Sequence, residues 1–275
     1  MTALAPTAAA PPVRARRPFL PLVRADLLKL RKNRGLVAVA AAMTIGGMVV
    51  AYGILAILHA VNPAHHGPAG GVEHLGNGIG LLALLGSAAA IVAGPRAGSG
   101  DLSSGVFREL VVTGRSRLAL FAARIPGGLA FLVPLVAVAV AIAAAATVGF
   151  AGSLPSPSAG LLAKAGLWVT VDIAFYFALA VGLASVIGSR AQTVGILLAW
   201  RLAVTPLLLS IGALGAGRDV LPQAAFERLA PQALNEYVRQ GPVVSMSVGA
   251  ALITIVLWTG AALAVGAWRT ATRDA

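Results

Sequence analysis

The sequence contains an uncharged run of 24 residues, at positions 35–58, and this run restricts what the chain can fold into. About 20 apolar residues in a helix cross the hydrocarbon core of a bilayer, so the run is long enough for one crossing. Charged residues make up only 11% of the chain, whereas a soluble domain carries about 25%. Most of the chain is therefore suited to contact with lipid or with other membrane helices. We expect an all-α polytopic membrane protein.

Further apolar runs of comparable length predict a bundle of six transmembrane helices. The fourth and fifth runs each carry one charged residue, Asp172 and Arg201. The first 18 residues are rich in Ala and Pro and lack periodicity, which predicts a disordered cytoplasmic tail. Residues 19–275 are expected to form one membrane domain. Its predicted spans are residues 35–58, 75–94, 125–150, 165–188, 193–215 and 243–268.

The distribution of Lys and Arg predicts the orientation in the membrane. Cytoplasmic loops of membrane proteins carry an excess of these residues. With both chain ends inside, 16 of the 21 cations fall in cytoplasmic segments, so we expect an N-in, C-in topology. This excess also accounts for the net charge of +12, and we therefore expect no nucleic-acid partner. The Arg- and Ala-rich composition is typical of a GC-rich bacterial genome, so the expected location is the bacterial cytoplasmic membrane.

A basic amphipathic segment precedes the first span. Residues 19–34 read FLPLVRADLLKLRKNR, with apolar residues at helical spacing and cations between them. Such a helix lies in the membrane interface, with its apolar face toward the acyl chains and its cations toward anionic headgroups. We expect an interfacial helix along the inner leaflet.

The longest charged interruption lies between the second and third predicted spans. Residues 96–124 carry five arginines against two acids, which places the segment on the cytoplasmic side. Apolar residues recur in it at helical spacing, which predicts a short amphipathic helix. Its apolar positions are Val106, Phe107, Leu110 and Val111, with Ser103 or Ser104 as its N-cap and Gly114 at its end.

Two outer segments also call for interpretation. The first outer loop region holds all four histidines, and adjacent His65 and His66 raise the alternative of a metal site. No helical pair of histidines four residues apart frames them, so we favour a solvated polar loop and expect no metal. Before the sixth span, residues 222–230 read PQAAFERLA and residues 231–239 read PQALNEYVR. Because Pro suits the first position of a helix, we expect two short helices at the outer surface.

The motifs of several enzyme classes are absent from the sequence. The chain contains no GxxxxGK[ST] phosphate loop, no GxSxG elbow and no HExxH pair. It also has no cysteine, which excludes disulfides, thiolate metal sites and a cysteine nucleophile. We therefore expect a protein that is not an enzyme and that has no nucleotide-binding site of its own.

The layout of these segments resembles the permease subunits of ABC-2 type exporters. The shared features are the basic N-terminal helix, the six spans and an R-x-L-x-x-x-G-R-S-R segment between spans two and three. In this chain the segment at positions 108–117 reads RELVVTGRSR. The resemblance covers the layout from about residue 22 to residue 269, and the long outer domain of some relatives is missing.

This resemblance implies both a function and a set of partners. The function is ATP-driven export of a hydrophobic or amphipathic compound. The implied assembly contains two permease subunits, identical or different, and two separate ATPase subunits that hold ATP and Mg, while this chain holds no cofactor. The residues implied to couple the permease to the ATPase are Gly105, Arg108, Glu109, Gly114, Arg115 and Arg117 in the central segment and Asp26, Lys29 and Arg31 in the interfacial helix.

Asp172 and Arg201 form the second candidate site, because a charge inside a span is rare and usually faces the interior of the bundle. The two charges either pair with each other or find partners on other helices. In a simple antiparallel hairpin centred on Arg190, Arg201 lies opposite about residue 179, some 10 Å from Asp172 at about 1.5 Å per residue. Direct pairing therefore requires a departure from regular helix geometry.

Two alternative functions follow from the same features. An ion-coupled secondary transporter would use Asp172 as its coupling site, although such carriers often have duplicated halves and this sequence shows none. A membrane immunity or sensor subunit would bind a peptide or lipid without transporting it. Neither alternative requires a separate ATPase.

Overall fold

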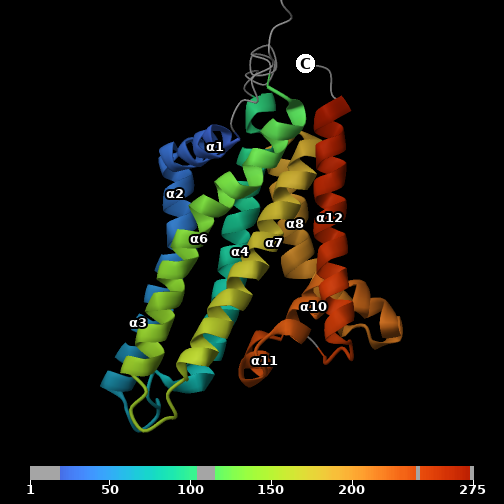
Figure 1. The fold of residues 1–275 in the computed structure, drawn as a ribbon. Helices are drawn as coiled ribbons and strands as arrows, with labels where there is room; N and C mark the ends of the chain where they lie inside the picture. Colours follow the sequence, from blue (N-terminus) through green and yellow to red (C-terminus); the bar gives the residue numbers. More distant parts are fainter. Residues whose placement is uncertain (1–18, 104–114, 240–241, 273–275) are drawn as a thin grey trace, which may run out of the picture.

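A computed structural model describes residues 19–103, 115–239 and 242–272, and within these ranges the chain is helical and forms no strand. Six helices in this part of the chain are long and apolar enough to cross a membrane, as predicted (Figure 1). The predicted tail, residues 1–18, lies outside the described residues. The elements are α1 (Leu20–Lys32), α2 (Arg34–Ala41), η1 (Ala42–Gly46), α3 (Gly47–Val61), α4 (Gly71–Ser103), α6 (Arg117–Gly149), α7 (Ala159–Ile187), α8 (Arg190–Ala199), η2 (Trp200–Val204), α9 (Thr205–Ser210), η3 (Gly212–Val220), α10 (Pro222–Leu229), η4 (Gln232–Leu234), α11 (Asn235–Val238) and α12 (Val248–Thr272).

Capping residues mark the starts of three spans and the end of one. The side chains of Ser116, Ser158 and Ser189 accept hydrogen bonds from backbone N–H groups in the first turns of α6, α7 and α8. Gly188 ends α7 with a φ of 76°, a left-handed conformation that suits glycine at a helix end. The α7–α8 connection is therefore a tight turn between two membrane helices.

Several span boundaries differ from those predicted, because hydropathy alone does not show where a helix continues through polar residues. α4 continues past Pro95 and Arg96 to Ser103, and α6 already begins at Arg117. α7 begins at Ala159, directly after its Ser158 cap and six residues before the predicted start. The fifth span ends at Ser210 because the following Gly-rich stretch forms η3, and α12 begins at Val248 and runs to Thr272.

These boundaries shorten the polar segment predicted at positions 96–124. Only residues 104–116 lie between α4 and α6, and Arg124 belongs to the second turn of α6, where it is buried. The predicted coupling helix lies in positions 104–114, outside the described residues. Ser103 is the last residue of α4.

The two ends of the bundle differ in architecture. At one end, here called the α1 end, α1 lies across the bundle rather than along it, and α12 finishes at the same end (Figure 1). The opposite end, the α10 end, carries α10 and α11. Six crossings place the start of the first span and the end of α12 on the same side. The N-in, C-in orientation stays a prediction from charge.

The core of the bundle is built around α4 and α7. In the most apolar stretches of these helices 67% of residues are buried, whereas the share is 6% in α12. Small residues allow the close approach of membrane helices. At the crossing of α7 and α12, an added Cβ on Gly182 would collide with the carbonyl oxygen of Ala262, and one on Gly266 would lie 2.9 Å from the Cα of Gly182.

The repeated PQA segments are helical, and most of the first is buried. α10 begins at Pro222 as predicted, and the residues from Pro222 to Glu227 are buried. The second copy forms the short elements η4 and α11. The second copy is thus divided between two very short elements, and α10 is buried because its apolar residues Ala225 and Phe226 pack into the bundle. The location of these helices at the outer membrane surface stays a prediction.

We expect Gly182→Ala to destabilise the protein by about 1–3 kcal/mol, because the new methyl group meets backbone that cannot move aside cheaply. Thermal unfolding of the purified full chain in detergent measures this effect. Gly260→Ala on α12 is the matched control, because nothing lies within 4 Å of a Cβ at that position. Equal thermal midpoints for the two variants would contradict tight packing at the α7–α12 crossing.

Candidate functional site

The two intramembrane charges form an ion pair. An Nη2 of Arg201, in η2, lies 3.8 Å from an Oδ2 of Asp172, in α7. Their side chains are 2% and 1% exposed. Removal of both charges from water is costly, and their mutual attraction offsets part of that cost. The pair therefore ties the fifth span to the fourth.

The departure from regular geometry that this pairing requires occurs at Arg201 itself. Residues Trp200–Val204 form a π-helical turn, which interrupts the regular α-helical spacing of the fifth span. The antiparallel alignment that placed Arg201 opposite residue 179 assumed an uninterrupted helix. The long Arg201 side chain and the wider turn together bring the guanidinium to Asp172.

Further polar and aromatic groups surround the ion pair. The Arg201 guanidinium lies 4.9 Å from the centre of the Tyr176 ring, a cation–π distance. Neither carboxylate oxygen of Asp172 has a hydrogen-bond partner among the described residues, and the same holds for Nε and Nη1 of Arg201 and the hydroxyl of buried Thr205. The intramembrane cluster of Asp172, Tyr176 and Arg201 thus has hydrogen-bonding capacity that its own contacts do not use.

α10 covers this cluster at the α10 end of the bundle. The Trp168 indole N–H donates a 2.8 Å hydrogen bond to the Phe226 carbonyl, and the Phe226 ring packs edge-on against Phe175 at 5.2 Å. Gln223 Nε2 donates to Glu227 Oε1 at 3.3 Å. Tyr176 is within electrostatic range of Glu227 as well as of Asp172 and Arg201. α10 therefore extends the polar interior toward the end of the bundle.

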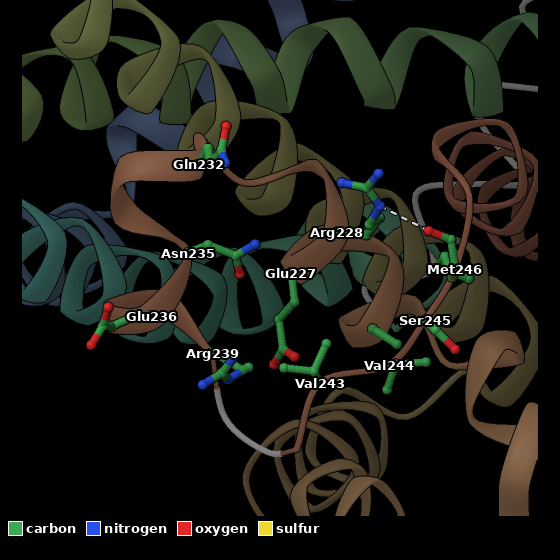
Figure 2. Close-up of a pocket in the computed structure, with 11 residues that line it drawn as sticks. Glu227, Arg228, Gln232, Asn235, Glu236, Arg239, Val243, Val244, Ser245 and Met246 are labelled. Atoms are coloured by element: carbon green, nitrogen blue, oxygen red, sulfur yellow. Dashed lines mark hydrogen bonds between the residues drawn. The ribbon is translucent and has the colours of Figure 1, made fainter.

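Glu227 also lines a pocket of about 650 Å³, here called the α10 pocket (Figure 2). Glu227 is 5% exposed. Arg228 Nε donates a 2.8 Å hydrogen bond to the Met246 carbonyl, which fixes one wall to the segment before α12. The lining residues are Ala224, Glu227, Arg228, Gln232, Asn235, Glu236, Arg239, Val243, Val244, Ser245 and Met246.

At the α1 end, cations from three helices meet the carboxyl end of α4. Buried Arg124 in α6 donates a 2.7 Å hydrogen bond to the Gly98 carbonyl, which also accepts from the Ser185 hydroxyl of α7 at 3.3 Å. A Cβ on Gly100 would lie 3.3 Å from Lys29 Nζ and 3.5 Å from an Arg190 Nη2. The last carbonyls of a helix and its dipole both favour positive charge. This α4-end cluster thus connects α1, α4, α6, α7 and α8.

Five of the predicted coupling residues lie in the described ranges: three contact other helices, and two are more accessible to solvent. Asp26 packs against α6, since a Cβ on Gly127 would lie 2.8 Å from its Cβ, and Lys29 belongs to the α4-end cluster. Arg117 donates to the Ala271 carbonyl of α12 at 3.1 Å. Arg31 is exposed and Arg115 half-buried. The others, Gly105, Arg108, Glu109 and Gly114, lie outside the described residues.

The histidines do not gather into a metal site. His59 Nδ1 lies 2.7 Å from the His66 carbonyl, His65 Nδ1 lies 3.2 Å from Asn62 Oδ1 and His74 Nδ1 lies 3.0 Å from the Gly70 carbonyl. Within the described ranges, no group of three or more His, Cys, Asp or Glu side chains is placed to hold a metal ion.

Sequence reasoning did not identify Arg124, Gln223 or Glu227 as interior polar residues. Arg124 was assigned to a polar loop, although it lies seven positions after Arg117, on one face of a continuous helix. The signal for α10 was the apolar content of PQAAFERLA, which favours burial over the surface. No protein-family model matches the chain, and no curated protein is significantly similar to it.

We expect Arg201→Met to destabilise the protein by about 3–5 kcal/mol, because Asp172 then remains buried without its charge partner. The double variant Asp172→Leu with Arg201→Met removes both charges and should recover most of that loss. Thermal unfolding and the level of folded protein in the membrane measure both effects. A double variant no more stable than the single one would show that the pair does not hold the two spans together.

We expect Arg124→Gln to cost about 1.5–3 kcal/mol, because it removes a charged hydrogen bond to the buried Gly98 carbonyl. Arg24→Gln, at an exposed position of α1, is the control for a change of charge alone. Chemical denaturation of the parent and both variants measures the loss in the free energy of unfolding. A similar small loss in both would mean that the α4-end cluster contributes no more than a surface charge.

Proposed function

We propose that this chain is the permease subunit of an ATP-driven exporter of the ABC-2 type, which moves a hydrophobic or amphipathic compound across the bacterial cytoplasmic membrane. The observation that carries the proposal is the position of α1. It lies across the α1 end of the bundle, where Lys29 approaches α4 at Gly100 and Asp26 packs against α6 at Gly127. A partner that pushed on α1 would therefore act on several spans at once.

The chemistry of coupling supports the same interpretation. ATP is held by the separate ATPase, since the sequence has no phosphate loop, and the permease needs a surface that transmits force. Exposed Arg31 and half-buried Arg115 offer cations for carboxylates of a partner. Asp26, Lys29 and Arg117 instead hold α1 and α6 in place, so their contribution to coupling is the stiffness of the platform.

α4 provides a path along which a push can travel. Its carboxyl end is held in the α4-end cluster, and near its other end Gly76 lies directly against the Tyr237 ring of α11. A Cβ on Gly80 would lie 3.1 Å from the Tyr237 carbonyl oxygen. Rigid helices with close backbone contacts at both ends move as bodies rather than bend. In this proposal α4 relays ATPase closure to α11 and the α10 pocket.

The proposed assembly has two permease subunits, alike or different, and two ATPases. An ion-coupled carrier that uses Asp172 is the main alternative, and the ion pair weighs against it, because protonation of Asp172 would leave Arg201 buried without its partner charge. A sensor or immunity subunit would keep the α10 pocket and need no platform for an ATPase.

Affinity purification of the tagged full chain from its host in mild detergent tests the proposal. We expect an ATPase subunit to copurify with the parent. In a variant with Arg108, Glu109 and Arg115 all changed to Ala, recovery of the ATPase should fall at least about tenfold, because several charged contacts are lost together.

The control variant changes Arg14, Arg16 and Arg17 to Ala, which removes three cations from the tail that precedes α1. It should retain the ATPase. The proposal fails if no ATPase copurifies in several detergents and in nanodiscs. Transport that persists without nucleotide but stops without a proton gradient would favour the ion-coupled carrier instead.

A further inference from the structure

We propose that the α10 pocket binds a zwitterionic amphiphile with a primary ammonium group and a nearby phosphate or carboxylate. The ammonium group binds at Glu227, and the anionic group lies at the mouth near Arg228 and Arg239. This assigns a ligand chemistry to a site that the coupling function leaves unused.

The inner end of the pocket presents a buried carboxylate. Glu227 lines the pocket although its exposed fraction is only 5%, and Figure 2 shows its side chain extending toward the segment that carries Val243. Gln223 Nε2 donates to one of its oxygens, which orients the group. A carboxylate so shielded from water binds an ammonium more strongly than a surface carboxylate does, because the local dielectric constant is lower.

The mouth of the pocket carries both signs of charge. Arg228, Glu236 and Arg239 are exposed there, and with Glu227 they make two acids and two bases around one cavity. A ligand with a single charge would meet a like charge at one end of its path. A ligand with an ammonium at its tip and an anion behind it matches the order of a carboxylate inside and arginines at the mouth.

The remaining walls select for a primary amine and an apolar tail. Asn235 also lines the pocket, and its amide oxygen is a further acceptor for N–H groups, which a quaternary ammonium does not have. Val243, Val244 and Met246 form an apolar wall. The volume of about 650 Å³ lies in the range of about 300–1,000 Å³ that is usual for small-molecule sites.

Two sources carry this chemistry: an aminophospholipid of the surrounding leaflet and a soluble zwitterion with an apolar part, such as a short peptide with apolar side chains. The binding itself does not depend on the exporter proposal. Only the role of the ligand as a transported compound rests on that proposal.

Native mass spectrometry of the purified full chain tests the inference, with phosphatidylethanolamine, phosphatidylcholine and phosphatidylglycerol of identical acyl chains added in turn. We expect phosphatidylethanolamine adducts to exceed the other two. Glu227→Gln should weaken phosphatidylethanolamine binding by about tenfold or more, because a charged hydrogen bond becomes a neutral one. Glu73→Gln, the same change at an exposed position of α4, should leave it unchanged.

A second variant covers the case in which Glu227→Gln disturbs folding. Arg239→Gln changes an exposed side chain at the mouth and should weaken binding of phosphatidylethanolamine while it leaves binding of dodecylamine, which has no anionic group, unaffected. A short peptide that displaces the lipid from the parent chain would identify the soluble source and support the same site. Equal binding of the three lipids, with no displacement by the peptide, would overturn the inference, and so would unchanged binding in both variants.

The two proposals fail separately. Loss of lipid binding in Glu227→Gln without any copurifying ATPase would keep the α10 pocket and remove the exporter. A copurifying ATPase together with lipid adducts that ignore headgroup and variant would keep the exporter and remove this ligand.

Discussion

The carboxyl end of α4 is the point on which the rest of the bundle depends. The carbonyls in the last turn of a helix have no partner within the helix, and in lipid each unsatisfied group is costly. In the last turn of α4, Lys29 and Arg190 come close at Gly100, where the absence of a side chain leaves room for them, and two residues earlier the Gly98 carbonyl accepts hydrogen bonds from Arg124 and Ser185. One helix end thereby fixes the position of α1 and of three other spans. The same contacts explain how Arg124 is accommodated in the interior.

α7 is the second helix on which the packing of the bundle depends, and it makes different kinds of contact along its length. Near the α4-end cluster it offers Ser185, and at the α12 crossing it offers Gly182. Further along, Asp172 pairs with Arg201, and near its start Trp168 holds the backbone of α10. These contacts of different kinds follow one another along a single helix. They therefore fix both how close the neighbouring helices lie to α7 and how far each is shifted along it. α4 and α7 together therefore determine the distance between the two ends of the bundle.

Hydropathy and charge predicted the number of spans and the presence of α1, because both depend on composition over long windows. They failed at the ends of α4 and α6, where Pro95, Arg96 and Arg124 look like interruptions in sequence but gain helical or tertiary surroundings in the fold. The Asp172–Arg201 pair was left open, since its geometry depends on a π-helical turn at Trp200–Val204 that no periodicity reveals. α10 was predicted as a short helix from its leading proline, but the burial of Glu227 together with its apolar residues depends on tertiary contacts that the segment alone does not reveal.

The way α10 is held limits how the α10 pocket can change shape. The Phe226 carbonyl is bonded to Trp168 on α7, and Arg228 is bonded to the Met246 carbonyl just before α12, so α10 cannot leave its place without a break in one of these contacts. α7 and α12 themselves meet at Gly182, Ala262 and Gly266, where no space is left for a larger side chain. A shift of α7 at the α4-end cluster would thus reach α10 through the Trp168 side chain and its hydrogen bond to the Phe226 carbonyl. This bond and the bond from Arg228 to the Met246 carbonyl therefore connect movements of α7 and α12 to Glu227.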